Sequence, residues 1–254
     1  MSTRIDYDIV AVEYDQQPFR GKNVDPELIN FVEIKGTHNL KILDLACGTG
    51  SQLIANQNKY PDMQMTGSDL SKGMLQVARA KSKKIQWIEA DLTALPLPNN
   101  CYDYVSCQFA FHHVPNKLKG LAEVHRVTAP SGRFVMKNIS PHHMQDIMLF
   151  KVFPQALEQD LQDYMEPKRI AAHLEEIGFS QVKLEFETIE FPMTLGALFT
   201  RVSDKMSSSE LALLSDEHYQ KGLKDLQDQI DQMGAEYSFD DQVVLMTIVA
   251  DKES

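Results

Sequence analysis

Short apolar runs and amphipathic segments take turns along the first 140 residues of the chain. The apolar runs have the length of buried strands and cover residues 41–46, 63–67, 85–89, 104–108 and 133–139. The segments between them carry apolar side chains at helical spacing, which predicts helices over residues 51–60, from Ser71 to about Lys81, and over 117–127. A turn is expected at residues 130–132, and an earlier helix is expected from Pro26 to about Val32 with Asp25 as its N-cap. Strands that alternate with helices through short connections predict a parallel sheet with helices on both faces.

Beyond residue 140 this rhythm changes. Helical patterns dominate, and two more strands are expected, with helices over 141–164, 168–177 and most of 195–234, and strands over 182–191 and 239–250. The predicted fold class is α/β, a Rossmann-like, doubly wound, mostly parallel sheet of seven strands. No repeat or linker divides the chain, so we expect one domain made of an N-terminal helical cap (1–35), a core (40–140), two helical lid insertions (141–167 and 194–236) and the last strand (239–250).

Composition narrows the classes of function. The net charge is −11, which disfavours a nucleic-acid partner, and the one dense basic cluster (Lys81, Lys83, Lys84) ends a predicted helix, where it complements the helix dipole. The three cysteines lack the spacing of metal ligands, so no metal site is expected. With no apolar signal segment and no run of about 18 apolar residues, we expect a cytoplasmic protein without a membrane span.

The stretch that organises the core is a strand followed by a glycine turn. Its apolar run ends in Ala46-Cys47-Gly48-Thr49-Gly50, and helical spacing begins directly afterwards. Glycine lets a backbone approach a ligand closely, and the first N–H groups of a helix favour an anionic group. A dinucleotide-binding turn would have a third glycine at position 53, which is Leu53, and no acid such as Asp44 just before it.

Three acidic residues, Asp44, Asp69 and Asp91, stand at or near the ends of the first three strands. A carboxylate at the end of the second strand can accept both hydroxyls of a ribose, and one after the third strand can accept from an adenine amino group. A nicotinamide dinucleotide would use the first two of these acids. The negative charge at the turn suits a ligand with an amine and a sulfonium better, and S-adenosylmethionine is such a ligand.

At this point the sequence resembles a known family, the class I S-adenosylmethionine-dependent methyltransferases. The similarity covers about residues 40–140. It lies in Leu43-Asp44-Leu45-Ala46-Cys47-Gly48-Thr49-Gly50, in Ser68-Asp69-Leu70-Ser71 with Met74-Leu75, in Ala90-Asp91-Leu92 with Leu95-Pro96-Leu97-Pro98, and in Tyr102-Asp103-Tyr104-Val105. The segment Phe111-His112-His113-Val114 is similar to the subgroup that methylates quinones, biotin precursors and other small molecules.

The resemblance implies which residues bind S-adenosylmethionine and its product S-adenosylhomocysteine. The turn would pass close to the methionine part, and Asp44 would help to hold its amino group, directly or through water. Asp69 would bind the ribose, and Gln108 would lie near the sulfonium or the methionine backbone. The adenine would lie against Leu70 and Met74 with Asp91 and Leu92 at its edge, and an N-terminal tyrosine would close over the cofactor. The implied cofactor residues are Tyr14, Asp44, Ala46, Gly48, Gly50, Asp69, Leu70, Met74, Asp91, Leu92 and Gln108.

Methyl transfer is an in-line displacement that requires alignment, and a base only if the acceptor must lose a proton. His112, His113, His142 and His143 are the candidates for that base, and packing is the alternative role for each. We expect a small or medium-sized, partly apolar acceptor and a monomer or homodimer. Two other interpretations stay open here: a non-catalytic S-adenosylmethionine-binding protein and a nicotinamide-dependent reductase.

Overall fold

The computed structural model describes residues 23–36, 39–207 and 209–254, and these divide into two compact units. The first, which we call the core unit, contains residues 23–138, Pro167–Glu185 and Thr247–Ser254. The second, the helical unit, contains Ile139–Glu166 and Phe186–Met246. Both predicted insertions fall in the helical unit, apart from Pro167. Their role as a lid, and the expectation of a single domain, stay predictions.

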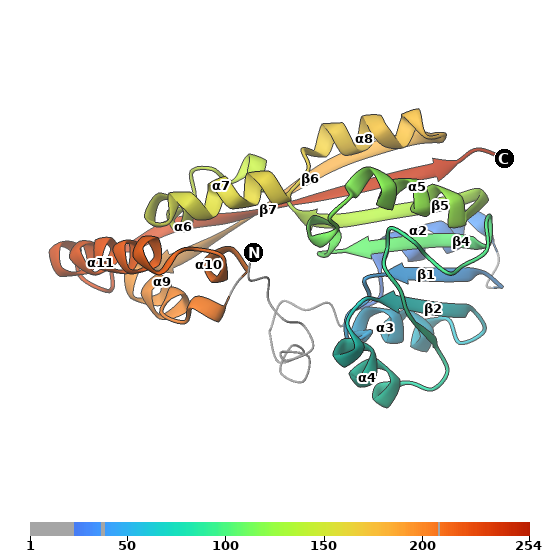
Figure 1. Cartoon of the computed structure of the whole chain (residues 1–254), viewed down its shortest axis with the longest axis horizontal. Coiled ribbons are helices and arrows are strands. Elements are labelled where there is room, and N and C mark those ends of the chain that lie inside the picture. Colours follow the sequence, from blue (N-terminus) through green and yellow to red (C-terminus); the bar gives the residue numbers. More distant parts are fainter. Residues whose placement is uncertain (1–22, 37–38, 208) are drawn as a thin grey trace. The chain divides into compact units, whose positions relative to one another are not determined.

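The sheet has seven strands in the order β3-β2-β1-β4-β5-β7-β6, which agrees with the predicted fold class. The strands are β1 (Lys41–Leu45), β2 (Gln64–Asp69), β3 (Gln86–Glu89), β4 (Tyr102–Gln108), β5 (Thr128–Ile139), β6 (Phe179–Thr194) and β7 (Ser238–Lys252). The neighbours β3, β2, β1, β4 and β5 pair in parallel, and the arrows of β1, β2 and β4 point the same way in Figure 1. The strand order reverses between β1 and β4, and this is where such sheets place their ligands.

The helices of the core unit follow the predicted pattern closely. They are α2 (Pro26–Lys35), α3 (Ser51–Lys59), α4 (Lys72–Lys81), the short 3-10 turn η2 (Phe111–His113), α5 (Lys117–Val127) and α8 (Pro167–Glu176). Asp25 is the N-cap of α2, as its place before a proline predicts, and Ser71 caps α4 by accepting the Met74 N–H at 3.0 Å. Helix α2 runs three residues beyond the predicted end and stops at Gly36, which has a positive φ of 61°.

The turn predicted at residues 130–132 is wrong, because this segment belongs to β5. Tyr102 of β4 pairs with Thr128 of β5, and Tyr104, two residues further along β4, pairs with Arg133. More residues of β5 than of β4 therefore lie between these two pairs, which makes a bulge. Ser131 takes a φ of 59° in this bulge. Proline and glycine marked the irregularity correctly, but an irregularity inside a paired strand has the same local composition as a turn.

The helical unit contains η3 (Pro141–His143), α6 (Met148–Val152), α7 (Pro154–Asp163), α9 (Leu195–Val202), η4 (Lys205–Ser207), α10 (Ser209–Ala212) and α11 (Asp216–Met233). The predicted helical stretch over 141–164 is thus broken into three pieces. Pro154 explains one break, since its ring prevents a helix from continuing through it but suits the first helical position of α7.

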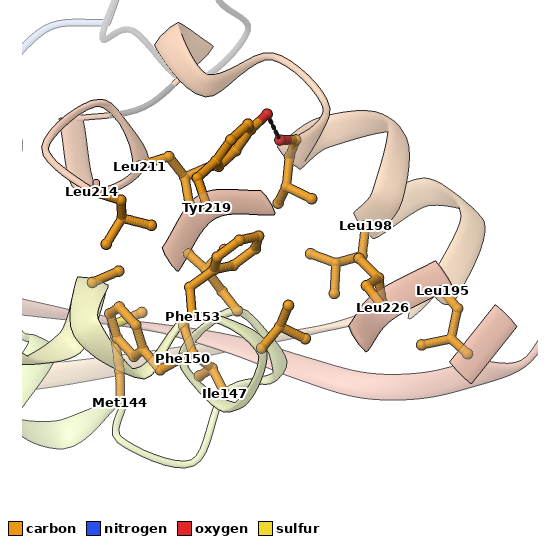
Figure 2. Packing of buried hydrophobic residues seen from close by; sticks show 14 of the residues in the cluster. Met144, Ile147, Phe150, Phe153, Leu195, Leu198, Leu211, Leu214, Tyr219 and Leu226 are labelled. Carbon is orange, nitrogen blue, oxygen red and sulfur yellow. Dashed lines mark hydrogen bonds between the residues drawn. The ribbon is translucent and has the colours of Figure 1, made fainter. Parts of the chain in front are cut away.

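A separate hydrophobic core holds the helical unit together, and Figure 2 shows its packing. Phe153 and Tyr219 stack with ring centroids 6.1 Å apart, and the Tyr219 hydroxyl donates to the Val202 carbonyl at 2.7 Å. Apolar side chains three or four residues apart along α11 include the buried Leu226 and the partly buried Leu223 and Ile230. These side chains pack within the unit.

Candidate cofactor site

The glycine turn leaves β1 in an unusual backbone conformation. Ala46, Gly48 and Gly50 have φ values of 52°, 55° and 72°, all in the left-handed region. Glycine adopts this region at no steric cost, whereas Ala46 is strained there. Gly50 is also the N-cap of α3 and supplies no side chain to it. At the end of β1 the turn therefore exposes backbone groups to a ligand, with few side chains in the way.

A single tryptophan packs against this turn. A Cβ atom built on Gly50 would lie 2.3 Å from the Trp87 ring, and one built on Gly67 would lie 2.5 Å from the same ring and 2.9 Å from the Cys47 sulfur. The Trp87 indole N–H donates to the Ser82 carbonyl at 3.0 Å, which fixes the orientation of the ring. Sequence reasoning did not single out Trp87, because the residues around it in the sequence do not indicate which part of the fold its ring contacts.

Asp69 connects the ends of β1 and β2. One oxygen of its carboxylate accepts the Gly48 N–H at 2.7 Å and the other accepts the Ser71 N–H at 2.8 Å. The predicted adenine contacts differ in their surroundings: Leu70 is 68% exposed, whereas Met74 is buried. Their contacts with an adenine stay predictions. The geometry shows that Asp69 holds the turn in place whatever else it binds.

The loop after β3 begins with the exposed Asp91, which accepts the Thr93 N–H at 2.7 Å, and continues into the buried Leu92. Arg126 of α5 fastens the rest of this loop. Its guanidinium donates to the Leu95 and Leu97 carbonyls at 2.9 and 2.7 Å and pairs with Glu123 at 2.7 Å. Five donors in a fixed fork suit such a role.

Two buried carboxylates lie on the face of the sheet beside the turn. Asp44 of β1 accepts the Ser106 hydroxyl at 2.7 Å, and Asp25 accepts the Tyr104 hydroxyl at 2.7 Å and the Gln108 side-chain amide at 3.3 Å. Burial raises the pKa of both carboxyls, and for Asp44 to about 7, where the nearby Asp25 and Asp69 add to the effect and the Ser106 hydrogen bond opposes it. Lys137 is the cation that acts on the pKa of Asp25, and no cation is among the described groups that shift the pKa of Asp44.

The three side chains that donate to these carboxylates share a pattern in the sequence. Tyr104, Ser106 and Gln108 alternate along β4, so their side chains lie on one face of the strand. Polar residues at every second position of a buried central strand have to find partners. Gln108, predicted near the sulfonium or the methionine backbone of the cofactor, directly follows Cys107, which pairs with Leu45 at the end of β1. Asp25, by contrast, was predicted only as a helix cap.

The candidate histidines fall in two places. His112 and His113 belong to η2 of the core unit, with ring centroids 3.8 Å apart, and the buried His112 lies with Nδ1 3.3 Å from the Asn138 amide nitrogen. His142 and His143 belong to η3 in the helical unit. His142 Nδ1 is the one buried side-chain nitrogen or oxygen without a hydrogen bond in the described part of the chain. Burial and the neighbouring His143 lower the pKa of His142. Tyr14 lies outside the described residues.

The described residues contain neither a metal cluster nor a membrane-spanning helix. No group of three or more His, Cys, Asp or Glu side chains among them is arranged to hold a metal ion. Nor is any helix in the same residues long and apolar enough to cross a membrane.

Comparison with known proteins gives matches of two kinds. A profile described as a methyltransferase domain matches residues 42–132. The demethylmenaquinone methyltransferase of Thermus thermophilus is 36% identical over 105 residues, which are 40% of this chain and 48% of that protein. That of Bacillus licheniformis is 30% identical over 186 residues, 64% of this chain and 78% of that protein. The match to the first of these spans about half of the relative's length.

Among solved structures, phosphoethanolamine N-methyltransferase 2 of Haemonchus contortus, in complex with phosphomonomethylethanolamine and S-adenosylhomocysteine, has a similar fold. Its TM-score is 0.61 at 18% identity, over 97% of this chain and 58% of that chain. At this identity the likeness concerns the fold alone.

Proposed function

The chain belongs to the class I S-adenosylmethionine-dependent methyltransferases, and on that premise we propose that it methylates a small or medium-sized, partly apolar acceptor. The observation that carries this proposal is the charge of the site. Asp44 and Asp25 are buried beside a glycine turn, and Lys137 is the cation that lowers the pKa of Asp25. A cationic ligand with an amino group suits these carboxylates, whereas the pyrophosphate of a dinucleotide would meet their repulsion.

The residues fit S-adenosylmethionine, whose sulfonium makes its methyl group an electrophile. Asp44 would hold the ammonium group beside the turn, and the turn's glycines would let the backbone lie against the methionine part. Asp69 keeps the turn in shape through Gly48 and offers its carboxylate to the ribose hydroxyls. Asp91 and the Leu92 backbone would meet the adenine edge, with Leu70 and Met74 against its ring.

The protein's task in the transfer is to align the two reactants. The acceptor's nucleophilic atom forms a bond to the methyl carbon as the bond from that carbon to sulfur breaks, and the sulfur keeps the electron pair. Where the acceptor loses a proton, a neutral imidazole takes it. His112 suits this role least, because its Nδ1 accepts from the Asn138 amide and its proton therefore sits on Nε2. His113 and His142 are the proposed bases, and the lowered pKa of His142 keeps it neutral.

The acceptor class rests on the relatives. Two demethylmenaquinone methyltransferases are among the similar proteins, and their names specify a partly apolar quinone-type acceptor. We propose an acceptor of the same general chemistry, bound with the help of the methionine- and phenylalanine-rich helical unit. Met144, Phe150 and Phe153 already pack in its core, so other side chains would have to face the acceptor.

Ligand binding followed by product analysis tests this proposal. Thermal shift and calorimetry with S-adenosylmethionine, S-adenosylhomocysteine and NAD should show stabilisation by the first two only. Incubation with S-adenosylmethionine and a panel of quinols and other small acceptors should then give a product heavier by one methyl group. Stabilisation by NAD alone would overturn the proposal, and binding without any methylated product would identify a non-catalytic binding protein.

A further inference from the structure

Asp25 is the most thoroughly buried acid beside the turn, and its role as a helix cap uses only part of its carboxylate. It is 3% exposed, and one oxygen accepts the Glu27 N–H at 3.1 Å as the cap of α2. The other oxygen accepts two side chains of β4, the Tyr104 hydroxyl at 2.7 Å and the Gln108 amide nitrogen at 3.3 Å. A capping aspartate needs neither of these contacts.

The Gln108 contact fixes which way its amide faces. A glutamine side chain ends in a carbonyl oxygen and an NH₂ group on opposite sides of one carbon, and the two are interchangeable by rotation. A carboxylate accepts hydrogen bonds and cannot donate them, so Asp25 selects the orientation with Nε2 toward itself. The Oε1 atom therefore points away from Asp25, as a hydrogen-bond acceptor.

The position of Gln108 makes this orientation relevant to ligand binding. Gln108 is the last residue of β4 and is only half-buried, and it directly follows Cys107, which pairs with Leu45, the last residue of β1 before the glycine turn. At this place an acceptor oxygen attracts N–H groups and positive charge, whereas an NH₂ group would repel them. The amide dipole thus adds to the negative charge of Asp44 only while Asp25 is a carboxylate.

We propose that Asp25 is a positioning residue for the cofactor site, one that holds Gln108 with its carbonyl oxygen toward the ammonium group that S-adenosylmethionine and S-adenosylhomocysteine share. This inference rests on the proposed function, because it names the cofactor that the oriented amide receives. Asp25 does not touch the cofactor itself. It acts through Gln108, and its effect disappears when Gln108 is removed.

Asp25→Asn tests the inference with little disturbance of the fold. Asparagine caps a helix about as well as aspartate and has the same shape, so α2 keeps its cap. Its NH₂ group, however, faces Gln108 as a donor and turns the Gln108 amide around. We expect calorimetry to show affinity for S-adenosylhomocysteine about tenfold weaker, which corresponds to about 1.4 kcal/mol.

A double-mutant cycle separates positioning from a simple loss of charge. In the Gln108→Leu background, Asp25→Asn should change the affinity for S-adenosylhomocysteine by less than about twofold, because its target is gone. Equal losses with and without Gln108 would mean that Asp25 acts through its charge alone, and would overturn the inference.

Tyr104→Phe is the matched control on the same carboxylate. It removes the other hydrogen bond to Asp25 and leaves the Gln108 contact, so we expect a lower Tm with an affinity change of less than about threefold. A loss as large as that of Asp25→Asn would contradict the proposed role of Gln108. If the wild-type protein failed to bind S-adenosylhomocysteine at all, the proposed function itself would fail, and that result is distinct from either outcome of the cycle.

Discussion

The two units bury acidic side chains in different settings. In the core unit, Asp25 and Asp44 each accept a hydroxyl from β4, and the strand ends beside them carry the glycine turn. In the helical unit, Asp160 of α7 is 7% exposed. Burial raises the pKa of its carboxyl, and the nearby acids Glu210 and Asp163 raise it further. Organised hydrogen bonds around a carboxylate indicate a site prepared for charge, whereas burial among other acids indicates a packing compromise.

This difference suggests that effects on stability and effects on cofactor binding can be separated by mutating one unit at a time. Every described residue that we assign to the cofactor belongs to the core unit. Substitutions in the helical unit should therefore change stability without changing cofactor affinity, and substitutions around the turn should change both or affinity alone.

Removing a large side chain from the helical core should have the greatest effect on stability. Phe153 is 1% exposed and fills the space beside Gly222, where a Cβ atom would lie 2.2 Å from its ring. Phe153→Ala should lower the free energy of unfolding by about 3–5 kcal/mol in a denaturant titration. Leu161→Ala on α7, where the side chain is 36% exposed, is the control and should cost less than about 1 kcal/mol.

The same variant tests the separation of the units. At a temperature where Phe153→Ala is folded, its dissociation constant for S-adenosylhomocysteine should match the wild-type value within about threefold. A loss of more than about tenfold would show that the helical unit takes part in cofactor binding.

Asp69→Ala should have the largest effect on affinity. It removes the predicted ribose contact together with the acceptor for the Gly48 and Ser71 N–H groups, so the turn loses its support. We expect binding of S-adenosylhomocysteine to weaken about 100-fold, measured by calorimetry. Asp91→Ala is the comparison at the next strand end. Besides its proposed adenine contact, the exposed Asp91 carboxylate accepts the Thr93 N–H of its own loop and supports no part of the turn, so its loss should cost less. Unchanged affinity in Asp69→Ala would contradict the placement of the ribose.

Gly67→Ala should destabilise the core unit by about 2 kcal/mol, because the new methyl group overlaps the Trp87 ring. Trp87→Leu removes the nearer obstacle and leaves the Cys47 sulfur at 2.9 Å, so the added cost of Gly67→Ala in that background should fall to about half in denaturant titrations. Additive costs would show that something other than Trp87 requires glycine at this position.

The pH dependence should show the smallest effects and differ between the two units. Both carboxyls have raised pKa values, about 7 for Asp44 and about 8 for Asp160. The stability that each contributes is therefore full below the ordinary carboxyl pKa of about 4 and is lost as pH rises from there through its own raised pKa. Asp160→Asn should raise Tm by about 3 °C relative to wild type at pH 9, and by clearly less at pH 5. A constant difference across this range would exclude titration of Asp160 as the cause.

The titration of Asp44 should be seen in the pH dependence of ligand affinity. Its ionised form attracts the ammonium group of S-adenosylhomocysteine, so the affinity should rise roughly tenfold between pH 5.5 and 7, where an α-amine with a pKa of about 8 stays protonated. The Asp44→Asn variant should bind weakly and without this slope. A slope that persists in the variant would assign the titration to another group.

Much of the core unit could be predicted because its signals are local. Asp25-Pro26, Ser71 and the glycines of the turn each specify a helix end or a turn within a few residues, and the structure has α3 and α5 within one residue of their predicted bounds. The bulge in β5 and the break before Pro154 were not predicted. Whether a proline or glycine there makes a turn, a bulge or a helix break depends on strand pairing and packing with distant residues. The contacts of Asp25 with Tyr104 and Gln108 span 79 and 83 residues, so no local pattern contains them.

The position of Trp87 has a practical consequence. It is the only tryptophan in the chain, and its ring packs directly against Gly50 and Gly67 at the cofactor turn. Indole emission responds to nearby charge and solvent, so selectively excited fluorescence from this protein originates at one known place. The unmodified chain therefore carries a built-in optical probe of its turn, with which ligand binding there can be followed in real time without a label.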